Sequence, residues 1–389
     1  MIIPRILLAG VMLTLVASCD ITDAGDTETT PTVAFSLDSR PGQPTIADGV
    51  VYLGSQAGVM HAVSMQTGQE LWRFETDGPI FHPPLVNGDL LLFGSWDGNL
   101  RAVNKANGEL IWAFQAGQVD WDTRDIFING IPAIVDGVAY FSSEDFNVYA
   151  VDIETGKEVW RHALPEEPQA REIPIVDRVA YIGTWDGHVY AIDIDSGELV
   201  WRSATDDQGR ASLPDQVAFV TVVPIVTEEA VYFSDWAGNL FAVDRADGQQ
   251  LWRFDPGAAD SRHVGSRSFM ALVGEVLYYS TLEDQHLYGV NRLTGHKVWG
   301  MQTEGIVYGP RSAGSNIALL FEFLPDASGE GGAMSMHAMY MTTRQVLWTT
   351  NDPASGPTIV GDVVYYGASN GTVLGRDLHT GEEVFQLGE

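Results

Sequence analysis

A unit of about 46 residues recurs along this chain, and the repetition constrains the fold more strongly than any other feature. Two of its copies read LLFGSWDGNLRAVNKANGELIW at 91–112 and AYIGTWDGHVYAIDIDSGELVW at 180–201. Eight copies follow one another from residue 44, and the seventh is the most degenerate. Each copy ends in an aromatic residue, and these are Trp72, Trp112, Trp160, Trp201, Trp252, Trp299, Trp348 and Phe385.

Each unit divides into four short runs of alternating apolar and polar residues, here named A to D, with turn residues between them. The turn between runs B and C often holds Asp-Gly or Asn-Gly, as at 97–98, 186–187 and 370–371. These dipeptides predict a two-residue hairpin with positive φ at both positions. Four antiparallel strands per unit, with no helical periodicity between units, are typical of a propeller blade. We therefore predict an all-β, eight-bladed β-propeller over residues 44–389.

The tryptophans that end the first seven units are expected to be structural. A large apolar side chain at one fixed position of every blade suits a contact between neighbouring blades, and its indole N–H finds a nearby carbonyl. The Thr-Gly, Ser-Gly and Asn-Gly pairs before these tryptophans are interpreted as turn residues rather than phosphate ligands. The segment 321–339 interrupts the seventh unit. We expect it to be a loop that widens one hairpin, with a partner contact as the alternative.

The N-terminus has the features of a secretion signal, because one arginine precedes an apolar run too short to span a bilayer. The stretch from Val16 to Cys19 resembles a bacterial lipobox, so we predict that residues 1–18 are removed and that Cys19 is acylated. A plain cleaved signal with an incidental cysteine is the alternative. Residues 19–43 are polar and acidic and are expected to form a tether. The prediction is a lipid-anchored protein of the bacterial cell envelope that faces the periplasm.

Two segments compete for the outer strand of the last blade. TVAFSLD at 32–38 matches the fourth-strand segment LWRFETD at 71–77, and it could close the ring from the N-terminal side. The last unit also carries its own candidate, EEVFQL at 382–387. The sequence leaves the closure open between these two.

Four further tryptophans fall outside the repeated position. In a propeller the B–C hairpins and the D–A connections emerge on one side, here named the B–C face, and the A–B and C–D turns emerge on the other, the A–B face. Long loops and aromatic clusters on a rigid scaffold commonly carry recognition. We therefore predict a binding face there, although each tryptophan could instead pack its own hairpin against the next blade. The candidate residues are Trp96, Trp121, Trp185, Trp236, Asp122 and Arg124.

The charge balance excludes one class of partner. Lys and Arg number 21 against 52 Asp and Glu, a net charge of −31, which repels nucleic acid. The acidic loop with Asp120, Asp122 and Asp125 could ligate Ca²⁺, but such a loop in so acidic a protein is more often solvated. The histidines His188 and His286 share a repeat position with Asn99 and Asn239, so we interpret them as hairpin residues rather than metal ligands. Metalloprotease, hydrolase-elbow, dinucleotide and P-loop motifs are missing from the sequence.

The pattern Y-x-G-x-x-D-G-x-[VL]-[YF]-A-[VI]-D-x-x-[TS]-G-x-x-x-W, as at 181–201, resembles the pyrroloquinoline-quinone-type (PQQ-like) propeller repeat. That repeat occurs in quinoprotein alcohol dehydrogenases and in the outer-membrane assembly lipoprotein BamB and its relatives. The dehydrogenases imply PQQ stacked on a tryptophan, a Ca²⁺ ion, an aspartate base and a disulfide of adjacent cysteines. Cys19 is the single cysteine here, so that disulfide is impossible, and we expect neither PQQ nor Ca²⁺ and no enzyme activity.

The resemblance to BamB implies a non-catalytic, protein-binding scaffold that serves the β-barrel assembly machinery. Asp20 after the acylated cysteine resembles an inner-membrane retention signal of enteric bacteria, so the choice between outer and inner membrane stays open. Two alternatives remain. One is a degenerate quinoprotein that binds PQQ or another small ligand in the axial funnel, and the other is a sensor or adhesin whose acidic surface binds divalent ions or cationic partners.

Overall fold

The computed structural model describes residues 42–117, 127–128, 130–168, 172–205, 220, 223–236, 238–257, 269–281, 285–312, 316–325, 332–353 and 355–388. The chain divides into two units, 1–32 and 33–389, and every described residue belongs to the second. The predicted signal, Cys19, the tether up to residue 41 and the candidate strand 32–38 therefore lie outside the described residues. The described part of the chain contains no helix that is long and apolar enough to cross a membrane.

The second unit is built from eight four-stranded antiparallel sheets, each contiguous in the chain, as the repeat predicts. The first four sheets are β1 (Thr45–Ala47), β2 (Val50–Gly54), β3 (Val59–Ser64), β4 (Glu70–Glu75); β5 (Leu85–Asn87), β6 (Leu90–Gly94), β7 (Asn99–Asn104), β8 (Leu110–Gln115); β9 (Ala133–Val135), β10 (Val138–Ser143), β11 (Asn147–Asp152), β12 (Glu158–Ala163); β13 (Ile175–Val176), β14 (Val179–Gly183), β15 (His188–Asp193) and β16 (Leu199–Ala204). The other four are β17 (Ile225–Val226), β18 (Ala230–Ser234), β19 (Leu240–Asp244), β20 (Gln250–Phe254); β21 (Phe269–Val273), β22 (Val276–Thr281), β23 (His286–Asn291), β24 (Lys297–Gln302); β25 (Ile306–Ser312), β26 (Ile317–Pro325), β27 (Gly332–Tyr340), β28 (Gln345–Thr350); β29 (Thr358–Val360), β30 (Val363–Gly367), β31 (Val373–Asp377) and β32 (Glu383–Leu387).

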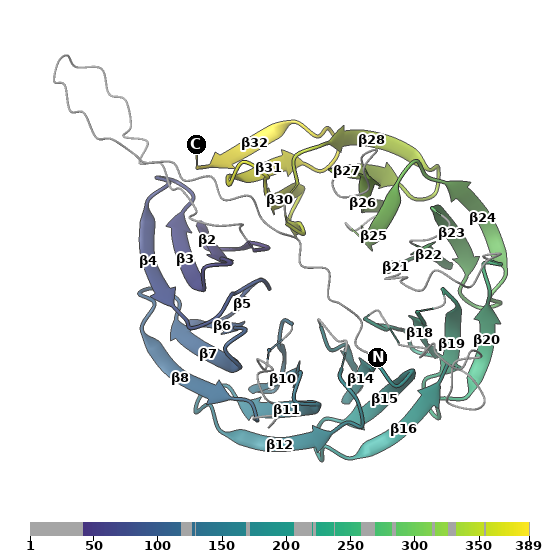
Figure 1. Ribbon diagram of the computed structural model, residues 1–389, viewed down its shortest axis with the longest axis horizontal. Helices are drawn as coiled ribbons and strands as arrows, with labels where there is room; N and C mark the ends of the chain where they lie inside the picture. Colours follow the sequence, from purple (N-terminus) through teal and green to yellow (C-terminus); the bar gives the residue numbers. More distant parts are fainter. Residues whose placement is uncertain are drawn as a thin grey trace. The chain divides into compact units, whose positions relative to one another are not determined.

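The sheets are arranged radially as blades 1 to 8 of a β-propeller, with the fourth strand of each blade on the outer rim (Figure 1). The apolar core lies between blades rather than within them. One cluster, for example, joins Tyr181, Val189 and Trp201 of blade 4 to Phe233 and Phe241 of blade 5. A four-stranded sheet has two apolar faces, so closing the ring is what removes both faces of every blade from water.

The hairpin turns differ from the prediction. At Asp97-Gly98 only the glycine has positive φ, at 80°, and its N–H donates to the carbonyl of Ser95 at 3.1 Å. This B–C loop therefore contains three residues and ends in a left-handed glycine, which suits a type I turn. The corresponding loop of blade 3 ends in Phe146 instead, with a φ of 67°. Two-residue turns with positive φ at both positions occur instead between the first two strands, as at Asp48 (51°) and Gly49 (75°).

The repeated tryptophans fasten neighbouring blades together. The indole N–H of Trp201 in blade 4 donates to the carbonyl of Arg245 in blade 5 at 2.9 Å. Gly248, in the C–D turn of blade 5, packs directly against the indole ring of Trp201. A Cβ added at Gly248 would come within 2.6 Å of Trp201 Cε3. The equivalent indole hydrogen bonds have lengths of 2.8 to 3.0 Å at Trp72, Trp112, Trp160, Trp252 and Trp348.

Among the described strands, each blade takes all four of its strands from one contiguous stretch of chain, including the last. β32, which contains EVFQL, occupies the outer position of blade 8. Leu387 of this strand packs in one cluster with Val51 and Leu53 of blade 1. Gln43 also donates to the carbonyl of Pro357 at 2.9 Å, which links the inner edges of the two blades. The C-terminal candidate therefore supplies the fourth strand of the last blade.

Blade 7 departs most from the repeat. Its middle strands, β26 and β27, contain nine residues each, whereas the corresponding strands of the other blades contain five or six. Of the segment 321–339, residues 321–325 and 332–339 are paired strand rather than the expected loop, and residues 326–331 lie outside the described part. In its described residues the insertion lengthens the two strands of the hairpin.

Candidate functional site

The structure describes three of the four predicted tryptophans of the B–C face, one each in the hairpins of blades 2, 4 and 5. Trp96 is packed between Phe81 and Phe127, with ring centroids 4.6 and 4.1 Å away. Its indole nitrogen is buried and has no hydrogen-bond partner among the described residues. Trp96 therefore packs between the chain segments that precede and follow blade 2.

Trp185 is the exposed member of this set, with 38 % of its surface accessible, whereas Trp96 and Trp236 are half-buried. Its amide N–H donates to the carbonyl of Glu167 at 3.0 Å, so its backbone is fixed while part of its side chain is exposed. The other predicted residues of this face, Trp121, Asp122 and Arg124, lie outside the described residues. The three described tryptophans come from separate blades.

The aspartates of the B–C turns organise their own hairpins. Asp186 accepts hydrogen bonds from Thr184, from the amide of His188 at 3.2 Å and from the hydroxyl of Tyr190 at 2.7 Å. Burial alone would raise its pKa, but these hydrogen bonds and nearby His188 lower the pKa of Asp186 to about 2. In return, burial and the bond to Asp186 raise the pKa of Tyr190 above its usual value.

The side chains two positions after these aspartates serve the same turns. His188 Nδ1 lies 3.0 Å from the carbonyl of Asp186, and the Asn99 amide donates to the carbonyl of Asp97 at 3.3 Å. The ordinary turn function predicted for His188 matches this geometry. Asp97 is also held by Arg101 through two bonds of 2.9 and 2.6 Å, and the pKa of Asp97 is lowered despite its burial. Because an efficient general base has a pKa near the operating pH, the lowered pKa values make these two carboxylates weak bases at neutral pH.

On the opposite, A–B face the structure reveals a repeated polar contact between blades. In three grooves the residue whose carbonyl accepts the tryptophan N–H also carries a basic side chain, and that side chain reaches an acid of the preceding blade. The pairs are Lys105 with Asp48 at 2.7 Å, Arg245 with Asp177 at 2.6 Å and Arg292 with Glu229 at 3.3 Å. Exposed ion pairs of this kind each stabilise a protein by less than about 1 kcal/mol. They nevertheless define the groove edges.

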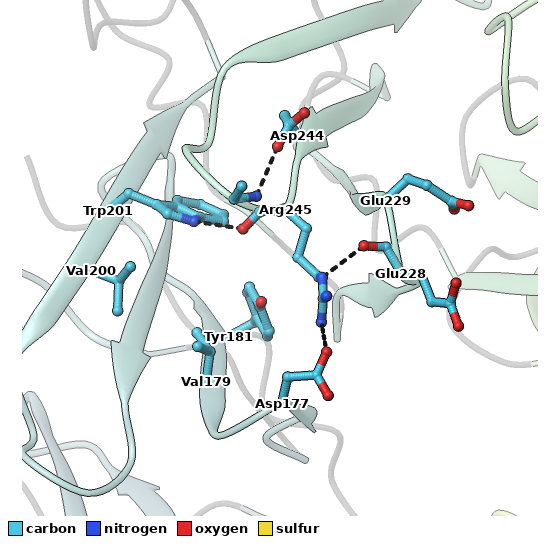
Figure 2. A pocket seen from close by; sticks show the side chains of 10 residues that line it. Asp177, Val179, Tyr181, Val200, Trp201, Glu228, Glu229, Asp244 and Arg245 are labelled. Atoms are coloured by element: carbon cyan, nitrogen blue, oxygen red, sulfur yellow. Dashed lines mark hydrogen bonds and ion pairs between the residues drawn. The ribbon is translucent and has the colours of Figure 1, made fainter.

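The groove between blades 4 and 5 on this face contains a pocket of about 470 Å³ (Figure 2). Trp201, Val200, Tyr181 and Val179 of blade 4 form its apolar side. Its acidic residues are Asp177, Glu228, Glu229 and Asp244. The guanidinium of Arg245 lies between the two sides, bonded to Asp177 and, through Nε, to the carbonyl of Glu228 at 2.9 Å.

The sequence prediction missed this pocket. Asp177 and Arg245 are 68 positions apart, and only the ring packing of blades 4 and 5 brings them together. The available signal was the A–B turn of blade 5, where Glu228-Glu229 replaces the glycine-containing turns of blades 1, 2 and 3. Two adjacent carboxylates in a position that other blades give to a turn glycine mark a local chemical difference.

Comparison with known proteins gives one family match and several distant relatives. The model of the family "Outer membrane protein assembly factor BamB" matches residues 21–180 and 173–387. BamB of Yersinia pestis is 28 % identical over 225 residues, which cover 56 % of this chain and 44 % of that protein. The tetrathionate hydrolase of Acidithiobacillus ferrooxidans is 25 % identical over 271 residues, which cover 61 % of this chain and 52 % of the hydrolase. The chain thus spans about half the length of the curated relatives it matches.

Among solved structures, BamB from Moraxella catarrhalis superposes with a TM-score of 0.64 at 17 % identity. The match covers 87 % of this chain and 94 % of that one. An identity this low establishes the shared propeller architecture and nothing about partners.

The residues do not fit the cofactor site implied by the dehydrogenase branch of the repeat. The chain has one cysteine, so two adjacent cysteines cannot cover a quinone. Within the described ranges, no three side chains of His, Cys, Asp or Glu converge where they could hold a metal ion. We derive no catalytic step through PQQ or Ca²⁺.

Proposed function

Because the chain belongs to the family of the outer membrane protein assembly factor BamB, we propose that it is a non-catalytic scaffold that binds other envelope proteins during outer-membrane protein assembly. One observation carries this proposal: the family match extends over both halves of the ring, from residue 21 to residue 387, rather than over a few blades. The lowered pKa values of Asp97 and Asp186 support the non-catalytic part, because an efficient general base has a pKa near the operating pH.

The proposal places the protein at the periplasmic surface of a membrane, held by a lipid on Cys19. The lipobox-like stretch before Cys19 supports this anchor. Replacing the cysteine, Cys19→Ala, should move the protein from the membrane fraction to the soluble periplasmic fraction. Separation of inner and outer membranes on a density gradient decides which of the two holds the wild-type protein. Retention of the Cys19→Ala protein in the membrane fraction would contradict the lipid anchor.

We propose the B–C face as the binding face, with Trp185 as the most accessible anchor among the tryptophans that the structure describes. A tryptophan ring exposed on a fixed backbone offers a large apolar contact at little cost in side-chain entropy. The hydrogen bond from the Trp185 amide to the Glu167 carbonyl fixes the backbone that carries this ring. Trp96 and Trp236 are more buried and would contribute less contact area.

Site-specific photocrosslinking in intact cells of the source bacterium tests this proposal. A photoreactive phenylalanine replaces Trp185 in one variant and Asp89, an exposed residue of the A–B face, in the control. We expect the Trp185 position to capture components of the β-barrel assembly machinery, identified by mass spectrometry, and the Asp89 position to capture none of them. If position 185 captures no envelope protein above background, the proposed scaffold role of the B–C face is wrong.

A second candidate function is catalysis or small-ligand binding, favoured by the match to the relative named tetrathionate hydrolase. Incubating the purified protein with tetrathionate and measuring its consumption tests the enzyme directly. Quenching of tryptophan fluorescence by PQQ in the presence of Ca²⁺ tests the degenerate quinoprotein. If tetrathionate is consumed or tryptophan fluorescence is quenched saturably, and the crosslinking fails, this second function is favoured over the scaffold role.

A further inference from the structure

We propose that the pocket between blades 4 and 5 on the A–B face is a binding site for an ammonium or guanidinium group carried on an aliphatic chain. This chemistry is shared by a lysine or arginine side chain of a partner protein and by a free diamine. The site lies on the side of the propeller opposite to the B–C face, so it does not depend on the proposed scaffold role.

The apolar side of the pocket suits the aliphatic chain of such a ligand. Val200 is half exposed on the outer strand of blade 4, and the Trp201 ring next to it is fixed by its hydrogen bond to Arg245. Tyr181 lies beneath them with 1 % of its surface exposed. A rigid wall of aromatic and aliphatic groups needs little reorganisation to cover a short hydrocarbon chain (Figure 2).

The charge of the pocket suits the cationic end. Arg245 is the single basic residue of the lining, and its guanidinium is already neutralised by Asp177. Arg292, outside the lining, lies 3.3 Å from Glu229. Among the described residues, Glu228 and Asp244 have no basic partner within ion-pair distance. Asp244 accepts the amide N–H of Ala246 at 2.8 Å through one carboxylate oxygen. The Glu228 carboxylate and the second oxygen of Asp244 therefore remain available to a cation from solution.

The neighbouring grooves lack this combination. Between blades 3 and 4, Arg178 rises from the A–B turn itself and binds Asp136 and Asp195 on either side, so both carboxylates there are occupied. Between blades 5 and 6, the turn that corresponds to Glu228-Glu229 is Gly274-Glu275, which removes one carboxylate. Groove 4/5 is thus chemically distinct within a repeated architecture.

Indole resonances of the ¹⁵N-labelled full-length protein provide a local readout, because the Trp201 N–H borders the pocket. The probes are Nα-acetyl-lysine N-methylamide, which represents a protein side chain, and 1,5-diaminopentane, which represents a free diamine. We expect a saturable shift of the Trp201 resonance with a Kd of about 1 mM, as befits a small ligand. The neutral control, in which the side-chain amine of the lysine probe is acetylated, should leave the resonance in place.

Glu228→Gln is the decisive variant, since its carboxylate makes no ion pair among the described residues and its backbone contact to Arg245 is retained. We expect this change to weaken binding about fivefold. The matched control, Glu275→Gln, removes the same charge from the equivalent turn of blade 6 and should leave the affinity unchanged. Binding of the lysine probe identifies a protein source, and binding of the diamine alone identifies a free diamine. Equal shifts by charged and acetylated probes, or no shift by either cation, would overturn the proposal.

Discussion

The guanidinium carbon of Arg344 lies 5.5 Å from the ring centroid of Trp299, where the corresponding contact between blades 4 and 5 is made by Gly248 on Trp201. Arg344 has a φ of 60°, so it keeps the left-handed conformation of the glycine it replaces. A cation over an indole face is stabilising, and this contact offsets part of the cost of positive φ in a residue with a side chain.

Arg344→Ala should therefore lower the free energy of unfolding by about 0.5 to 1 kcal/mol, because it removes the cation–π contact and keeps the unfavourable φ. Arg344→Gly should be closer to neutral, since relief of the φ cost compensates for the lost contact. Urea denaturation followed by circular dichroism measures both. An alanine variant as stable as the wild type would show that the guanidinium contributes nothing.

Gly248→Ala should be strongly destabilising, by about 2 to 4 kcal/mol. Its φ is 72° and an added Cβ would meet the Trp201 ring at 2.6 Å, so strain and overlap act together. Gly49→Ala is the matched control, because its φ is 75° and no atom lies within 4 Å of the added Cβ. The control isolates the backbone cost of about 1 kcal/mol. Equal losses of unfolding free energy in the two variants would show that the contact between Gly248 and the indole ring of Trp201 does not contribute to stability.

Much of the fold could be predicted because the sequence of each repeat determines its strands and turns locally. The alternating strands, the turn glycines and the closing tryptophan specify one blade, and eight copies specify a ring. The turn type could not be read correctly, since Asp-Gly at 97–98 is compatible with two loop lengths and the pairing of Gly94 with Leu100 selects the longer. The pocket was beyond reach for a similar reason, because its two sides belong to different blades and meet only through ring packing.

Asp186→Asn should give a pH-dependent loss of stability. The folded pKa of about 2 is below the ordinary value of about 4, so the ionised form stabilises the fold above pH 4 and this contribution disappears as the pH falls through 2. The side chain is 18 % exposed, and after allowance for solvent screening we expect a difference of about 1 kcal/mol at pH 6.

The difference between wild type and Asp186→Asn should shrink as the pH is lowered from 4 to 2, which urea denaturation at a series of pH values can follow. The exposed residue Glu275 provides the control, since Glu275→Gln should show only a small difference at every pH. A gap between Asp186→Asn and wild type that stays constant down to pH 2 would mean that lost packing, rather than lost charge, causes the effect.

The last blade allows a direct test of ring closure. Leu387 is 4 % exposed and packs against Val51 and Leu53, so Leu387→Ala should lower the stability of the whole propeller by about 2 to 4 kcal/mol. A chain that starts at residue 40 should melt at the wild-type temperature, because β32 already fills the outer position of blade 8. Scanning calorimetry of both variants separates the two closing segments. The opposite result would be a large fall in melting temperature for the truncated chain and little effect of Leu387→Ala. It would assign the closure of the ring to residues 32–38, since only then would the contact between blades 8 and 1 depend on the N-terminal segment.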